Sequence, residues 1–162
     1  TQFNANFVVG NPVRLCHGNN YNQCSSQVTV STGATLSADN WNLSLQSGGT
    51  QTFTLDAGAA WAGRSYLLLG TASGTAGFPF GPHQIPLTPD GYFFFTASNP
   101  NTFPLSGSAG ALNAAGLAGA AFTLPPGLPA ALAGLVLHHA FVVLGPTTVL
   151  AVSNPWPLTF RP

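Results

Sequence analysis

The sequence has almost no charge. Of its 162 residues only three Arg and three Asp carry a formal charge, and Lys, Glu and Met do not occur. An ordinary soluble domain has about a quarter of its residues charged, and this charge keeps proteins apart in solution. So few charges are typical of a surface that associates with copies of itself or is covered by glycan. The sequence therefore predicts an extracellular building block.

The same shortage excludes several classes of partner. No basic stretch could neutralise phosphates, so nucleic acid and anionic membrane surfaces are poor partners. No apolar run reaches the ~18 residues of a membrane span, because Gly134 and the His138-His139 pair break the longest candidate. The chain opens Thr-Gln-Phe-Asn without a basic segment, and we expect a mature, processed product.

The two cysteines bracket a short polar loop. Cys16 and Cys24 enclose the sequence His-Gly-Asn-Asn-Tyr-Asn-Gln and lack the CxxC spacing of redox and zinc motifs. In an exported protein this arrangement favours a disulfide, which would stabilise the fold by roughly 2–3 kcal/mol on the chain-entropy model.

The first nine residues show the alternation of a β-strand. Their apolar side chains fall on one face at a period of two, with Gln and Asn on the other face; the apolar residues are Phe3, Ala5, Phe7 and Val9. Gly10-Asn11-Pro12 then forms a hinge or turn signal. This strand either pairs in its own domain or inserts into a neighbouring subunit, unless it stays disordered.

Insertion would give a head-to-tail homopolymer. Strand addition combines main-chain hydrogen bonds with pockets for alternate side chains, and a head-to-tail contact that does not close makes a filament. The chain has no Lys, the residue that normally guards exposed sheet edges. This mode of assembly resembles the insertion of a donor strand between pilus subunits, although the sequence contains no pilin motif.

From residue 27 onward the chain reads as β-structure. About nine to eleven short strands, with turn signals every 8–12 residues, predict an all-β fold, a two-sheet sandwich of the immunoglobulin-like or jelly-roll type. We divide the chain into an N-terminal arm, residues 1–26, and a sandwich domain, residues 27–162. No 20–50-residue repeat indicates a solenoid or propeller.

Several segments carry specific predictions. The apolar run 66–69 predicts a strand buried on both faces, and the aromatic run within 91–96 predicts a strand buried between the sheets. Residues 111–118 predict two strands around a turn at Gly116, and 129–132 predict one helical turn. In the strand that follows Asn40, alternation places Trp41, Leu43 and Leu45 inward and Asn42 outward.

Residues 48–162 resemble an uncharacterised β-rich module found at the C-terminal end of exported bacterial proteins. The resemblance rests on Gly-Gly-Thr-Gln-Thr-Phe-Thr-Leu-Asp-Ala-Gly at 48–58, Ala-Gly-Arg-Ser-Tyr-Leu-Leu-Leu-Gly at 62–70 with Ser-Gly-Thr at 73–75, Leu-His-His-Ala-Phe-Val-Val-Leu at 137–144 and Ser-Asn-Pro-Trp-Pro-Leu-Thr at 153–159. It implies an exported β-rich module and no particular activity. The first 26 residues lie outside it.

Catalytic and metal-binding patterns are weak. There is no Gly-x-Ser-x-Gly elbow, the Gly-rich run 70–77 lacks the Lys of a phosphate loop, and the three Asp are scattered. Asp56 and Asp90 adjoin turns, where a carboxylate usually accepts hydrogen bonds from amides. His138 and His139 point to opposite faces of a strand, one buried and one toward solvent, and cannot chelate one metal. We expect neither an enzyme nor a cofactor.

Two features favour a contact with carbohydrate. The sequon Asn42-Leu43-Ser44 makes Asn42 the candidate for N-glycosylation. One exposed Trp would suffice for sugar binding. The preferred hypothesis is a structural subunit of an extracellular filament that polymerises through residues 3–9. The alternative is a monomeric, secreted carbohydrate-binding or adhesion module.

Overall fold

The computed structural model describes three stretches of the chain, residues 13–15, 26–28 and 33–162. The chain divides into two units, Thr1–Thr32 and Gly33–Pro162, whereas composition suggested a division after residue 26. In the first unit β1 (Val13–Leu15) pairs antiparallel with β2 (Ser26–Val28).

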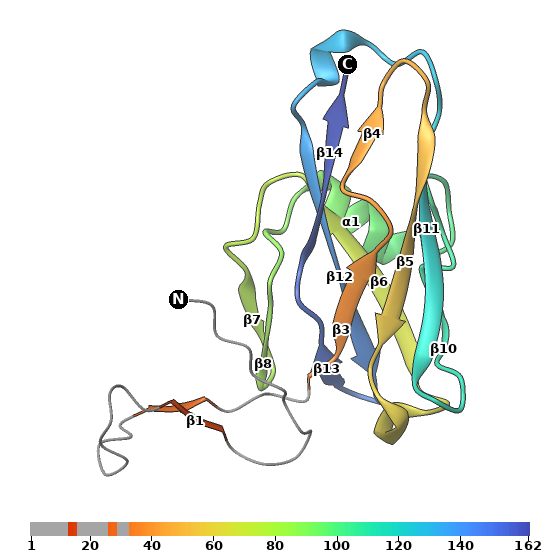
Figure 1. Ribbon diagram of the computed structural model, residues 1–162. Coiled ribbons are helices and arrows are strands. Elements are labelled where there is room, and N and C mark those ends of the chain that lie inside the picture. The colour runs from red at the N-terminus through yellow and green to blue at the C-terminus, as the bar shows by residue number, and fades with distance from the viewer. Residues whose placement is uncertain (1–12, 16–25, 29–32) are drawn as a thin grey trace. The chain divides into compact units, whose positions relative to one another are not determined.

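The second unit is a two-sheet β-sandwich, which confirms the predicted fold class (Figure 1). The first sheet consists, in spatial order, of β3 (Thr35–Ala38), β5 (Gly49–Asp56), β11 (Leu117–Leu124) and β9 (Leu105–Ser106). The second sheet consists of β10 (Ala109–Ala111), β6 (Ser65–Thr71), β12 (Val136–Leu144), β14 (Trp156–Arg161) and β4 (Asn42–Ser44). β13 (Val149–Val152) also pairs with β12, and only β4 and β14 run parallel.

The main core lies between the two sheets. Alternate residues of β5 are buried, and residues 117–124 pair with this strand along its whole length. Gly116, at a φ of 78°, makes the turn into β11, as the sequence predicted. Phe53, Leu55, Phe141 and Leu158 are among the fully buried side chains of this core.

A second, smaller apolar cluster lies on the outer face of the second sheet. Successive side chains of a strand point to opposite faces. Leu68 and Phe141 enter the main core, whereas Leu69, Ala140 and Val142 belong to the outer cluster. The predicted burial of 66–69 on both faces is confirmed for Tyr66, Leu68 and Leu69, and Leu67 is half-buried.

The outer cluster is covered by elements outside the two main sheets. The hairpin of β7 (Phe78–Phe80) and β8 (His83–Ile85) supplies Phe78 and Ile85, and helix α1 (Gly91–Ser98) supplies Phe93 and Ala97.

The aromatic strand predicted at 91–96 is wrong, because this segment forms α1. The carboxylate of Asp90 caps the helix by accepting from the backbone N–H of Phe93 at 2.8 Å, and the helix packs against β6; together these contacts override the β-propensity of the aromatic residues. The four aromatic side chains of this segment do not share one environment. Tyr92 packs against the main core and Phe93 belongs to the outer cluster, whereas Phe94 is 60% exposed and Phe95 38%.

Two short 3₁₀-helices complete the described helical segments, η1 (Ala59–Trp61) and η2 (Ala130–Leu132). The second confirms the helical turn predicted at 129–132. No helix of the described residues is long and apolar enough to cross a membrane.

Candidate functional site

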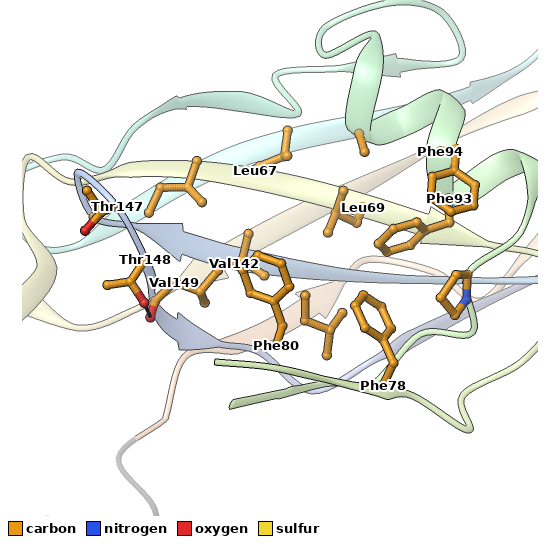
Figure 2. Close-up of a pocket in the computed structure, with 15 residues that line it drawn as sticks. Leu67, Leu69, Phe78, Phe80, Phe93, Phe94, Val142, Thr147, Thr148 and Val149 are labelled. Atoms are coloured by element: carbon orange, nitrogen blue, oxygen red, sulfur yellow. Dashed lines mark hydrogen bonds between the residues drawn. The ribbon is translucent and has the colours of Figure 1, made fainter. Parts of the chain in front are cut away.

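An apolar groove of about 570 Å³ opens over the outer face of the second sheet. Side chains of β6, β12 and β13 form its floor, and α1 and the β7–β8 hairpin form its walls (Figure 2). Phe93 and Phe94 project from the helix, Phe78 and Phe80 project from the hairpin, and Thr147 and Thr148 lie at the opposite end from the helix.

The side chains that line the groove are almost all apolar. Its floor includes Leu67, Leu69 and Val142, and its only side-chain polar atoms are the two hydroxyls of Thr147 and Thr148. None of the described residues that line it is charged. The volume lies in the range of ligand sites, but such sites also carry a few convergent polar groups that orient the ligand. The groove therefore suits an uncharged, apolar occupant.

Helix α1 is held against β6 by side chains that replace a neighbouring strand. Along the edge of β6 that faces away from β12, the N–H of Leu68 donates to the Ser108 carbonyl at 2.7 Å. The N–H of Gly70 then donates to Thr96 Oγ1 at 3.0 Å, and that of Ala72 to Asp90 Oδ2 at 2.7 Å. Three successive outward amides of this edge are thereby bonded.

Asp90 acts as a structural anion. Burial alone would raise the pKa of its carboxyl, but hydrogen bonds from the N–H groups of Phe93 and Ala72 and from the hydroxyls of Ser73 and Thr71 hold the pKa below its usual value. The expectation that Asp90 bonds amides near a turn is confirmed. The same holds for Asp56, whose Oδ1 accepts from the N–H of Gly58 at 2.9 Å.

The two adjacent histidines separate as predicted. His139 is fully buried among aromatic rings, and its Nε2 lies 3.0 Å from the hydroxyl of Tyr92, whereas His138 is half-buried. Burial lowers the pKa of His139 to about 3, with a further contribution from His138. Burial, and secondarily the charge of Asp90, raises the pKa of Tyr92. This pair is neutral at ordinary pH and is enclosed within the fold.

No catalytic or metal constellation emerges from the described residues. Asp39 accepts from the backbone N–H of Thr52 at 2.9 Å, as a turn carboxylate does. In the part of the chain that the structure describes, no three His, Cys, Asp or Glu side chains gather as metal ligands would.

The carbohydrate candidates lie at β4 and β14. Asn42 is exposed, as predicted, and its Oδ1 accepts from Arg161 Nε at 3.0 Å. Leu43 and Leu45 are buried, but the predicted inward orientation of Trp41 is wrong. Its side chain is 62% exposed and packs edge-on against the Trp156 ring, with centroids 5.9 Å apart. Trp41 precedes β4, so the strand's alternation does not extend to it.

Two predicted sites lie outside the described residues. These are the disulfide candidates Cys16 and Cys24, and the strand face formed by Phe3, Ala5, Phe7 and Val9.

The groove itself was missed by sequence reasoning. Its residues come from four separated segments, and the only signal was that two strands, 66–69 and 140–143, are apolar on both faces. Such strands require a covering layer on each side.

The chain matches no protein-family model, no curated protein and no solved structure.

Proposed function

We propose that this chain is a structural subunit of an extracellular filament or surface assembly, joined head to tail through its N-terminal strand. One observation carries the proposal: a nearly uncharged domain presents an open groove lined almost entirely by apolar side chains. Open apolar depressions of this volume are typical places for an apolar ligand or an apolar segment of a partner to bind.

The exposed aromatic residues support association. Phe80, at 49% exposure, and Phe94, at 60%, stand at the groove. Association through these surfaces would bury apolar area without desolvating a charge. Covalent glycan at Asn42 is compatible with this role, because its side chain is exposed on a short edge strand.

The test is the state of the purified native chain at neutral pH. Negative-stain electron microscopy and sedimentation velocity should show regular filaments. A single species at the monomer mass of 16.6 kDa, across the whole accessible concentration range, would contradict the proposal.

A monomeric carbohydrate-binding module is the second candidate, and Trp41 favours it. An exposed indole braced edge-on by a second Trp is a surface on which a sugar ring can stack. In this case a glycan array should identify a ligand for the wild-type protein. Trp41→Ala should lose binding to that ligand. Phe103→Ala, which also removes an exposed aromatic side chain, should retain it.

A further inference from the structure

We propose that the apolar groove is the acceptor for residues 3–9 of a second copy of this chain, with Phe3 and Phe7 as the anchoring side chains. This inference rests on the proposed function and adds the surface to which the arm binds.

Side chains already bond main-chain groups at parts of two sheet edges. Thr96 and Asp90 bond the outward amides of β6 at Gly70 and Ala72. In the first sheet, the outward N–H and C=O of Leu36 on β3 are both bonded by the side chain of Asn154, at 2.9 and 3.0 Å. An added strand at these places would have to displace existing bonds. Binding through side chains in a groove does not require this.

The groove selects an occupant without charge. None of the described residues that line the groove is charged. Arg64 lines a separate pocket that shares Leu144 and Gly145 with the groove, so an anionic lipid is an alternative occupant that the experiment below distinguishes. The aromatic side chains Phe78, Phe80, Phe93 and Phe94 offer edge and face contacts to other aromatic rings. Aromatic anchors that fill pockets are the usual centres of binding energy at protein interfaces.

The arm has the matching chemistry. Residues 1–12 contain no charged side chain, and they end in the hinge Gly10-Asn11-Pro12. In an extended strand, Phe3 and Phe7 would fall on the same face, about 13 Å apart. Ala5 between them leaves room for both rings to enter one elongated depression, and Gln and Asn on the other face would stay in water.

A complementation experiment with three full-length variants tests this pairing. The arm variant is Phe3→Asp/Phe7→Asp, and the groove variant is Phe80→Asp/Phe94→Asp. The control variant is Phe95→Asp/Phe103→Asp, which removes two exposed Phe and adds two charges at positions that do not line the groove. All four domain positions are at least 38% exposed, so the fold should persist, which circular dichroism checks.

The inference predicts that wild type and control assemble, and that the arm and groove variants are each monomeric. Mixed in equal amounts, these two variants should form a heterodimer of twice the monomer mass and nothing larger. One copy then supplies the only intact arm and the other the only intact groove. Such a heterodimer also shows that both variants are folded.

The other outcomes overturn it in distinguishable ways. If wild type assembles but the mixture stays monomeric, or the groove variant assembles like wild type, the arm binds elsewhere and only this inference falls. If wild type itself is monomeric, the proposed function falls and the inference falls with it. A monomeric mixture, together with a lipid extracted from wild type but not from the groove variant, would assign the groove to an acyl chain.

Discussion

The hydroxyl of Tyr92 lies 3.0 Å from Nε2 of His139 and joins helix α1 to the interior of the sandwich. The imidazole is enclosed by the rings of Phe53 and Phe122, at centroid distances of 5.1 and 5.7 Å. A buried polar group without a partner costs free energy, so this contact stabilises the position of the helix as well as the ring.

Replacing Tyr92 with Phe should destabilise the domain. The ring of His139 would lose its hydrogen bond while staying buried, and we expect the free energy of unfolding to fall by about 1–3 kcal/mol in urea titrations. Tyr66→Phe is the control. The hydroxyl of Tyr66 donates to the carbonyl of Gly107, which is partly exposed and can bond water instead, so its loss should be smaller. Equal losses in the two variants would contradict this account.

Acid should weaken the fold because His139 is buried in its neutral form. Folded His139 has a pKa near 3, whereas an unfolded His has one near 6.5. Between these values the unfolded chain binds a proton that the folded chain does not, so stability present above pH 6.5 is lost as the pH falls. We expect a loss of about 2–3 kcal/mol from pH 7 to pH 4.5.

His139→Leu provides the comparison for this pH dependence. Its unfolding free energy should change much less over the same interval, with a residual slope from His138, whose pKa burial also lowers. A wild-type profile parallel to that of His139→Leu would show that His139 does not titrate on unfolding.

Gly70 should not tolerate a methyl group. A Cβ built there meets the ring of Tyr92 and lies 3.1 Å from Cδ2 of His139. Gly70→Ala must displace the ring and its hydrogen bond, and we expect a loss of roughly 1–3 kcal/mol by urea unfolding. Gly119→Ala is the matched strand control, because its nearest neighbour lies 3.9 Å away. The idea fails if both variants unfold at the same urea concentration.

The fold class followed from the sequence because strand alternation and turn residues are local signals. The predicted strand at 66–69 and the turn at Gly116 coincide with β6 and with the start of β11. Local propensity failed at 91–96, where four aromatic residues favoured a strand. The Asp at position 90 is itself a helix-start signal, and tertiary contacts with β6 decided between the two structures.

The groove was beyond sequence reasoning for a different reason. Leu67, Phe80, Phe94 and Val149 are distant in the chain and become neighbours only when α1 and the hairpin cover the outer face of the sheet. The burial of His139 rather than His138 depended in the same way on which strand face met the core. Alternation predicts that the two histidines differ, but not which one is inside.

The edge of β6 yields a prediction that links stability to assembly. Thr96 Oγ1 accepts from the N–H of Gly70 and donates to the carbonyl of Phe93 at 2.9 Å, in a side chain that is 2% exposed. Thr96→Val keeps the shape and removes both bonds. We expect a loss of about 1–3 kcal/mol and faster hydrogen exchange at Gly70. Thr54→Val, exposed on β5, should change neither measurement.

The same substitution also tests why α1 covers this edge. An unbonded strand edge is a template for pairing with another chain, so Thr96→Val should form irregular aggregates under conditions where wild type gives a defined species. Light scattering and thioflavin fluorescence would measure this. If the variant is destabilised yet associates as wild type does, Thr96 serves stability alone. If aggregation rises, the helix also protects β6 from strand addition, which leaves the apolar groove as the surface on this side of the sheet that remains open to a neighbouring copy.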